Sequence, residues 1–464
     1  MAVAQQQKRK TVTLGELFNA AVDLHQKGEI EKAAPLYRTY LAKAPEHARG
    51  WTNYGALLRK MGQHRQAIAA HRRALEIDPG MENARNNLSN ALADAGEYAE
   101  AAELRQGMFE AAPEDHLKRR DYCVALRGLG QHERVIELVT EVEDKIDLEK
   151  DGELLLQRAL SRLMLGDYRG GFLDFEGRYA GTEVSLPQEV PWPRWTGQEI
   201  SGKRVLVLPE QGFGDAILMT RFLPALKAMG ADVSMVVKAP LQRLFEGLEG
   251  LDRLVSHARK SDVFDYYTPN MSLPHLVGFR DGNTPPPLPK FSIPGPSRKR
   301  AKALAAPFAE RLKIGVVWTG SLTYKANHRR STGPESFLSL AQVPGVQLFS
   351  LYKGPARDEF VASGMAGLIL DACGDDQDFA DSAALIDEMD LMITTDTAVV
   401  HVAASLGKPV WNLLSHEGFW LYGQGDTTPW YPSMKLYRQR ATGDWDELFQ
   451  RVEADLRAHL KARS

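Results

Sequence analysis

A segment around residue 396 combines residue types that could hold a phosphate-bearing ligand. Residues 391–394 predict a buried strand, and Asp396 and Thr397 follow it at the expected start of a helix. There, a hydroxyl and the free backbone N–H groups of the first helical turn can bind a diphosphate. His401 comes four residues after Thr397, on the same helix face. A lone histidine in such a place is more often packed or capping than a ligand, so both interpretations of His401 stay open.

A second candidate lies in the turn between a predicted buried strand, residues 204–208, and a predicted helix over 216–229. Gly212 and Gly214 in this turn have no side chain to keep a ligand away from the backbone. The turn also leads into a helix N-terminus, where backbone N–H groups are free. The pattern therefore predicts close approach of a ligand at this point.

This turn does not match a dinucleotide-binding fingerprint. That fingerprint requires a third glycine where Ile217 stands and an acidic residue after the next strand, where Lys238 stands. Asp215 would repel a neighbouring phosphate, so its carboxylate is better placed to act on a substrate or to stabilise the helix N-terminus. Position alone does not separate these two interpretations of Asp215.

The strands that must position these residues fall into two groups. Residues 204–208 and 233–237 form the first group, and a Pro-rich stretch over 284–296 follows as a predicted linker. The second group comprises residues 313–318, 348–351, 368–370, 391–394 and 409–413. Because strands alternate with helices, we predict two doubly wound sheets with ligands bound at the carboxyl ends of their strands, in the cleft between them.

The N-terminal part of the chain repeats with a period of 34 residues. The positions that keep this step are Gly28, Gly62, Gly96 and Gly130, and also Pro45, Pro79 and Pro113. The pattern resembles the tetratricopeptide repeat over residues 14–147, which implies helical hairpins stacked into a superhelix with a concave face. A looser fifth hairpin, with Tyr168 and Phe172, is expected to cap the stack near residue 180. We predict that the superhelix grips a protein segment; a spacer or dimerisation module is the alternative.

Composition excludes several classes of protein. The 464 residues include 57 basic and 60 acidic side chains, a net charge of −3, so no strong field draws the chain to nucleic acid or anionic lipid. Cys123 and Cys373 are the two cysteines, which argues against a disulfide framework or a zinc site and fits a reducing compartment. No signal-peptide core follows the first charges, and no apolar run is long enough to span a bilayer. We therefore expect a cytoplasmic protein.

Three motifs in the C-terminal half resemble the heptosyltransferase-related glycosyltransferases, in a group whose members carry fused tetratricopeptide repeats. They are Gly212-Phe-Gly-Asp215, Trp318-Thr-Gly320 and Asp396-Thr-Ala-Val-Val-His401. The resemblance covers about residues 200–455. It implies a GT-B architecture, with an activated nucleotide-sugar between two Rossmann-like lobes and no obligatory metal or other cofactor. It also implies a final helix that returns toward the first lobe, which residues 444–461 could supply.

The predicted fold class is therefore α plus α/β, a tetratricopeptide α-solenoid followed by a GT-B module of two Rossmann-like lobes. The expected domains are a superhelix over 11–180, a linker over 181–200, an N-terminal acceptor lobe over 201–296, a C-terminal nucleotide-sugar lobe over 297–440, and a C-terminal helix over 441–464.

The resemblance implies roles for particular residues. Asp215 corresponds to the general base, which would deprotonate an acceptor hydroxyl as it attacks the anomeric carbon. Asp396 would face the hydroxyls of the sugar, and Thr397 would face the phosphates. The other donor-binding candidates are Gly212, Gly214, Trp318, Thr319, Lys325, Asn327, Arg330, Lys353 and His401.

Basic residues in the loop over 319–331 would neutralise the diphosphate leaving group as its charge develops. A solvated basic loop is the alternative. Lys353, just after a predicted strand, is a further candidate for the same task. Ala398 stands where heptosyltransferases carry glycine, so the approach of the phosphate and the identity of the donor stay open.

Two acidic motifs superficially resemble metal sites. Neither Asp376-Gln-Asp378 nor Asp444-Trp-Asp446 ends a strand of the first lobe, so we interpret both as solvated loop or helix-start carboxylates and predict no metal site. The pair Trp430-Tyr431 could wall the cleft, although packing is the more common role of such a pair.

The leading hypothesis is a bacterial-type glycosyltransferase that transfers a sugar to a Ser or Thr hydroxyl of a protein held by the repeats. Flagellin-modifying and O-GlcNAc-transferase-like enzymes share this organisation. Its partners would be a protein acceptor and a nucleotide-sugar, and it could form a homo-oligomer. Two alternatives stay open: a glycan or lipid glycosyltransferase whose repeats serve assembly, and a noncatalytic protein-interaction scaffold.

Overall fold

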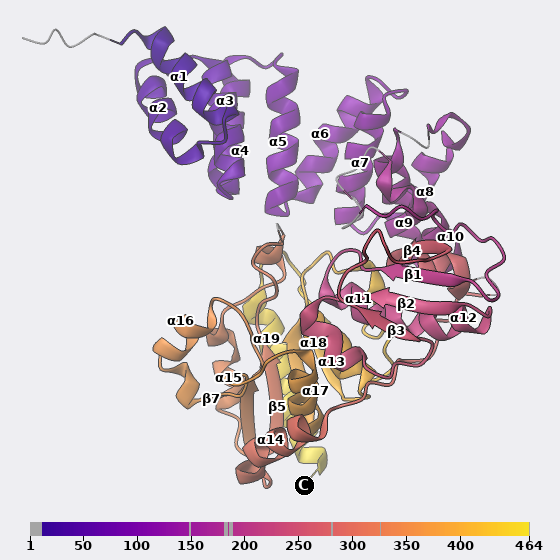
Figure 1. The fold of residues 1–464 in the computed structure, drawn as a ribbon. Helices are drawn as coiled ribbons and strands as arrows, with labels where there is room; N and C mark the ends of the chain where they lie inside the picture. The colour runs from indigo at the N-terminus through magenta and orange to yellow at the C-terminus, as the bar shows by residue number, and fades with distance from the viewer. Residues whose placement is uncertain are drawn as a thin grey trace, which may run out of the picture. The chain divides into compact units, whose positions relative to one another are not determined.

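The computed structural model describes residues 12–147, 150–180, 184, 189–279, 282–324 and 326–463. The chain divides into two compact units, unit 1 (Met1–Asp144) and unit 2 (Lys145–Ser464). Figure 1 shows helices throughout unit 1 and two sheets with surrounding helices in unit 2. Within the described residues, no helix is both long and apolar enough to cross a bilayer.

Unit 1 is a series of helical hairpins (Figure 1). Its helices are α1 (Leu14–Gln26), α2 (Ile30–Lys43), α3 (Ala48–Lys60), α4 (His64–Ile77), α5 (Glu82–Ala95), α6 (Tyr98–Glu110), α7 (His116–Gly128) and α8 (His132–Thr140). Each helix packs on the helix that follows it in the chain, both within a pair and between neighbouring pairs. The turns inside the pairs fall at Gly28, Gly62, Gly96 and Gly130, all with φ between 72° and 81°. Side chains with a Cβ are strained in this left-handed conformation, which explains the glycine period and confirms the predicted hairpins.

A buried histidine packs between the helices of the second hairpin. A Cβ on Gly55 of α3 would lie only 2.6 Å from the ring of His71 of α4, so the glycine makes room for the ring. His71 is 0% exposed, and neither ring nitrogen has a hydrogen-bond partner among the described residues. Burial therefore lowers the pKa of His71 to about 4, and the ring is neutral near pH 7.

Acidification should destabilise unit 1 through His71. The unfolded histidine titrates near 6.5 and the folded one near 4, so stability present above pH 6.5 is lost as the pH falls between these values. The expected loss is up to about 3 kcal/mol. Urea unfolding of the full chain at about pH 7.5 and about pH 5 should show a smaller pH-dependent loss in His71→Leu than in the wild type. Equal losses in both proteins would contradict this assignment.

Unit 2 begins with a fifth helical hairpin. Its elements are α9 (Gly152–Met164), α10 (Tyr168–Asp174) and the 3-10 turn η2 (Phe175–Tyr179). A buried ion pair holds it together, because Arg158 donates to both carboxylate oxygens of Asp174, at 2.7 and 2.9 Å. This ion pair therefore stabilises the hairpin in addition to its apolar packing.

The fifth hairpin shares a core with the α/β lobes that follow it. Tyr168 and Phe172 pack on Phe279 and Trp430, with ring centroids 5.2–6.3 Å apart. The sequence did not predict this contact. The end of the superhelix at residue 180 stays a prediction.

The first lobe is a four-stranded parallel sheet in the order β3-β2-β1-β4. Its elements are β1 (Arg204–Leu208), α11 (Phe213–Met219), η3 (Thr220–Phe222), α12 (Leu223–Ala228), β2 (Asp232–Val236), α13 (Gln242–Phe245), β3 (Arg253–Val255) and β4 (Tyr266–Pro269). The strands predicted at 204–208 and 233–237 are confirmed to within one residue. The single helix expected over 216–229 is instead interrupted by η3, just ahead of Pro224.

The second lobe is a six-stranded parallel sheet in the order β10-β9-β8-β5-β6-β7. Its strands are β5 (Leu312–Val317), β6 (Val346–Ser350), β7 (Ile369–Asp371), β8 (Leu391–Thr395), β9 (Val410–Leu414) and β10 (Met434–Arg438). Its helices are α14 (Gly295–Ala305), α15 (Leu338–Ala341), α16 (Arg357–Ala362), α17 (Phe379–Glu388), α18 (Ala398–Ser405) and α19 (Trp445–Arg463). Five of these strands and the final helix were predicted. The helix was expected to return toward the first lobe, whereas α19 packs on α15 and β10 of its own lobe. Two parallel sheets flanked by helices confirm the α/β class.

The acidic motifs of this lobe have different environments. The side chain of Asp376 is 1% exposed, accepts a hydrogen bond from Arg300, and lies 3.7 Å from Nζ of Lys353. The solvated interpretation is therefore wrong for Asp376, because basic partners compensate for its burial. Asp378 and Asp444 accept hydrogen bonds from backbone N–H groups at the starts of α17 and α19, which confirms the helix-start interpretation. Within the part of the chain that the structure describes, no three acidic, histidine or cysteine side chains cluster as metal ligands.

Candidate active site

Two short helices meet where the lobes face each other. α11 follows β1 and α18 follows β8, so each begins beyond the carboxyl end of a parallel strand, and the two helices contact one another (Figure 1). At this contact a Cβ on Gly214 would lie 2.8 Å from Cδ2 and 3.0 Å from Nε2 of His401. The two segments that the sequence singled out thus lie side by side, and the glycine permits their close approach.

Asp215 occupies the first turn of α11. The backbone N–H of Gly212 donates to its Oδ2 at 3.0 Å. Burial raises the pKa of Asp215 to about 6; the bond from Gly212 opposes this shift, and the negative charge of Asp396 adds to it. A carboxylate that titrates near neutral pH is suited to accepting a proton from a substrate hydroxyl.

Asp396 stands opposite, between β8 and α18. The hydroxyl of Tyr422 donates to its Oδ1 at 2.7 Å, and Nη1 of Arg330 lies 3.7 Å from its Oδ2. Burial raises the pKa of Asp396, and the positive charge of Arg330 opposes that shift. Arg330 was a predicted site residue. Tyr422 was not, because nothing in its sequence spacing connects it with Asp396.

Thr397 is the N-cap of α18, yet its side chain does not cap the helix. Its buried Oγ1 has no hydrogen-bond partner within the described residues. The N–H of Val400 donates to the carbonyl oxygen of Thr397 at 3.1 Å, and the N–H groups that precede it in the first turn of α18 lack partners inside the helix. A hydroxyl and amide groups of this kind together can bind an anionic oxygen.

His401 is a buried, neutral residue rather than an exposed ligand. Its Nδ1 lies 2.8 Å from the hydroxyl of Tyr431, and its other edge faces Gly214. Burial lowers the pKa of His401 to about 3, and the charges of Arg221 and Arg330 contribute. His401 was interpreted either as a packed residue or as a ligand. In the structure its side chain packs at the contact between α11 and α18.

Arg221 joins the two lobes from η3 and was missed in the sequence. Its Nη2 donates to the carbonyl oxygen of Trp430 at 3.1 Å, and its guanidinium lies 5.2 and 5.3 Å from the ring centroids of Trp430 and Tyr431. The side chain is 3% exposed. Its sequence position could have indicated it, because Arg221 is the single basic residue in the apolar run from 216 to 226. The packing role predicted for Trp430 is confirmed, and Arg221 holds Tyr431 beside His401.

The basic loop after β5 is partly exposed, with Leu322 at 55% and Tyr324 at 52%, and some of its other residues contact this region. Asn327 is buried and its Nδ2 donates to Oγ1 of Thr319 at 2.9 Å. The guanidinium of Arg330 lies 4.6 Å from the ring centroid of Tyr324 and points toward Asp396. The loop therefore brings one cation, with its supporting polar residues, to the carboxylate of Asp396. Lys325 lies outside the described residues.

Two predicted donor-binding side chains are not part of this group. Trp318 is buried against the rings of Tyr352 and Phe360, with centroids 5.1 and 4.9 Å away. Its bulk serves packing, and its role in donor binding stays a prediction. Lys353 donates to the carbonyl oxygen of Asp378 at 3.2 Å and faces buried Asp376. Its ammonium compensates for that burial, and its role in donor binding stays a prediction.

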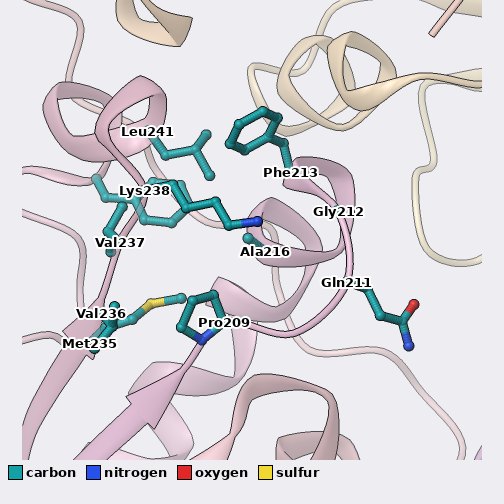
Figure 2. Close-up of a pocket in the computed structure, with 11 residues that line it drawn as sticks. Pro209, Gln211, Gly212, Phe213, Ala216, Met235, Val236, Val237, Lys238 and Leu241 are labelled. Carbon is teal, nitrogen blue, oxygen red and sulfur yellow. The ribbon is translucent and has the colours of Figure 1, made fainter. Parts of the chain in front are cut away.

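A small cavity lies beside the Gly212 turn, on the side of the first lobe (Figure 2). Figure 2 shows Lys238 and Phe213 on its wall, and Nζ of Lys238 lies 5.6 Å from the Phe213 ring centroid. The cavity volume is about 10 Å³, close to the room that one water molecule needs. It is therefore too small to be the site of a sugar.

Models of two protein families match segments of the chain. The family model of the tetratricopeptide repeat matches residues 58–119, and that of glycosyltransferase family 9 (heptosyltransferase) matches residues 356–433. The second match includes Asp396, Thr397, His401, Tyr422 and Tyr431. Both predicted resemblances are confirmed.

Individual proteins resemble the chain over different lengths. Protein FlbA of Caulobacter vibrioides is 26% identical over 454 residues, which cover 92% of this chain and 76% of that protein. The family 9 glycosyltransferase of Veillonella parvula covers 52% of this chain and 88% of its own, at 15% identity and a TM-score of 0.40. MamA of Desulfovibrio magneticus covers 37% of this chain and 94% of its own, at 18% identity and a TM-score of 0.33.

Proposed function

Because the chain carries a glycosyltransferase family 9 segment after its tetratricopeptide repeat, we propose that it transfers a sugar from a nucleotide-sugar to a Ser or Thr hydroxyl of a protein. One observation carries this proposal. Asp215, with a pKa of about 6, lies on the helix that contacts α18, where Thr397 offers a free hydroxyl beside Asp396. A proton acceptor and an anion-binding helix start thus occur together, as group transfer between two substrates requires.

The reaction assigns one task to each side of the contact. Asp215 accepts the proton of the acceptor hydroxyl while that oxygen bonds to the anomeric carbon and the carbon–oxygen bond to the diphosphate breaks. The first turn of α18, Thr397 and Arg330 stabilise the charge that develops on the leaving diphosphate. Asp396 accepts hydrogen bonds from the sugar. In this proposal Arg330 and the helix N-terminus provide the positive charge, and no resident metal is needed.

The repeats support a protein as the acceptor, because stacked hairpins form extended surfaces that bind chain segments. Cys123 and Cys373 are buried and unpaired with one another, which supports a reducing, cytoplasmic setting. If the repeats serve assembly alone, a chain that starts at Lys145 will modify its acceptor as fast as the full chain. A loss of protein modification with retained donor hydrolysis supports presentation of the acceptor by the repeats.

Donor binding should depend on Thr397. A thermal-shift screen against UDP-, GDP-, ADP- and CMP-sugars should find one donor that raises the melting temperature. Thr397→Val keeps the shape but removes a hydroxyl that has no partner among the described residues, so the unliganded melting temperature should stay unchanged. Loss of a hydrogen bond to a charged oxygen should weaken donor binding about tenfold or more.

Thr428 offers a matched control. It is buried in the same lobe, and its hydroxyl donates to the carbonyl oxygen of Leu421 at 2.8 Å. Thr428→Val should lower the unliganded melting temperature but keep the shift with donor. If no donor stabilises the wild type at saturation, the noncatalytic scaffold becomes the better hypothesis. If Thr397→Val binds as the wild type does, Thr397 has no role in donor binding.

A further inference from the structure

The turn that carries Asp215 has an unusual backbone. In the described part of the chain, Gln211 is the one residue other than glycine with a positive φ, 64°. Figure 2 shows its side chain directed away from Lys238 and Phe213, on the outside of the turn. A left-handed residue with a Cβ is strained, and such a conformation persists where surrounding contacts hold it. We therefore expect the neighbours of Gln211 on both sides to be held by contacts.

Glu210, directly before Gln211, is fixed by three side-chain hydrogen bonds. Arg178 donates from Nε to Oε1 at 2.7 Å and from Nη2 to Oε2 at 2.8 Å, and the hydroxyl of Tyr179 donates to Oε2 at 2.6 Å. The backbone N–H of Glu210 donates to Oδ1 of Asn270 at 3.0 Å. The carboxylate of Glu210 is 2% exposed, so its position depends on these donors.

On the other side of Gln211, Gly212 is tied to Asp215. Its N–H donates to Oδ2 of Asp215 at 3.0 Å, so Asp215 takes part in the turn that precedes it. Gln211 is thus held between two fixed neighbours. A shift of Glu210 must be absorbed by Gln211 or passed on to Asp215 through Gly212.

The residues that hold Glu210 come from outside both parallel sheets. Arg178 and Tyr179 end the turn η2, which closes the fifth hairpin. Arg178 is 0% exposed and also donates to the carbonyl oxygen of Phe175 at 3.0 Å and to Oγ of Ser272 at 2.9 Å. A buried guanidinium with this many partners has one orientation, so it can define the position of the carboxylate that it binds.

We infer that Arg178 and Tyr179 are positioning residues for the transfer reaction, because they hold Glu210 and, through the left-handed Gln211, set the place of Asp215. This inference rests on the proposed function. It makes the fifth hairpin part of the catalytic apparatus rather than a spacer between the repeats and the lobes. The proposed reaction assigns neither residue to a substrate.

Tyr179→Phe tests this role with a small change. It leaves the ring and removes the hydrogen bond to Glu210, together with the one that the Tyr179 hydroxyl accepts from Nη2 of Arg178 at 2.9 Å. We expect kcat to fall about tenfold with KM within about twofold, because the misplaced group is the base and not the donor site. Tyr437→Phe is the matched control. The Tyr437 hydroxyl donates to Oδ2 of Asp455 at 2.7 Å, a bond of the same kind between β10 and α19. Its loss should leave kcat unchanged.

The variant Gln211→Asn tests whether Tyr179→Phe lowers kcat by displacing Asp215 or by destabilising the protein. Asn adopts the left-handed conformation more readily than Gln. In a Gln211→Asn background the turn depends less on Glu210, so Tyr179→Phe should lower kcat by less than it does in the wild type. Equal losses of kcat in both backgrounds, or an equal loss in Tyr437→Phe, would overturn the inference.

Hydrogen exchange distinguishes a failure of this inference from a failure of the proposed function. If the wild-type chain transfers no sugar, the proposed function fails, and the hold of Arg178 and Tyr179 on Glu210 is judged on the backbone amides of residues 210–216. Their exchange should be faster in Tyr179→Phe than in the wild type and unchanged in Tyr437→Phe. Unaltered exchange in Tyr179→Phe would overturn the positioning role of Arg178 and Tyr179, whatever the activity.

Discussion

Asp215→Asn should abolish sugar transfer while leaving donor binding intact. General-base catalysis contributes roughly 10²–10⁴ in rate, so kcat should fall by at least about a hundredfold. The amide oxygen of Asn can still accept the N–H of Gly212 that now bonds to Oδ2, so the turn keeps its shape. A transfer assay, run beside the thermal shift with the same donor, measures the two effects separately.

The titration of Asp215 provides the control for this prediction. The carboxylate is ionised above its pKa of about 6, so kcat/KM should fall about tenfold per unit below that pH. Because the folded pKa lies above the usual 3.8, stability present at low pH is lost as the pH rises through 6. Asp215→Asn should therefore raise the melting temperature at neutral pH while it removes activity. Retained transfer, or a lower melting temperature, would contradict the assigned role.

A second large effect is expected from Gly214→Ala. The added Cβ would lie 2.8 Å from Cδ2 of His401, too close for carbon atoms, so α11 and α18 must move apart. Overpacking of this kind costs about 1–3 kcal/mol. A displacement of about 1 Å between reacting groups can lower a rate about a hundredfold. We expect a lower melting temperature by calorimetry and a loss of kcat of about that size.

Two further variants test whether this steric contact is the cause. A Cβ on Gly212 would approach Oδ2 of Asp215 at 3.3 Å and no other atom within 4 Å, so Gly212→Ala should lower the melting temperature less. In a His401→Ala background the ring that Gly214→Ala meets is absent, so the second substitution should cost little stability there. Wild-type melting and turnover in Gly214→Ala would show that the contact has no part in the site.

The sequence predicted those site residues that directly follow strongly apolar strands. Asp396 comes just after β8, and Asp215 lies in the first turn of the helix that follows β1; both strands are interior strands of their sheets. Because carboxyl ends of parallel strands face the cleft in such folds, local pattern was enough to bring these carboxylates together. The hairpins of unit 1 were predictable for a similar reason, since each depends on neighbours one period away.

Residues that reach the site from distant segments could not be predicted in this way. Tyr422 has no spacing that connects it to Asp396. Tyr431 was considered as a wall of the cleft, but its contact with His401 arises only in the tertiary fold. The ion pair of Lys353 with Asp376 was not predicted, because the burial of Asp376 is not visible in sequence. The strands β3, β4 and β10 were missed because they are short and mixed in polarity.

The core shared by the fifth hairpin and the lobes bears on how such chains can be recombined. Tyr168 and Phe172 cover Phe279 and Trp430, so a fragment cut at residue 181 would leave these rings in water. The exchangeable cassette is instead the whole of unit 2, from Lys145 onward. The repeats of unit 1 can therefore be exchanged, by recombination in a genome or by grafting at the bench. Such an exchange is compatible with folding when the junction falls before the fifth hairpin.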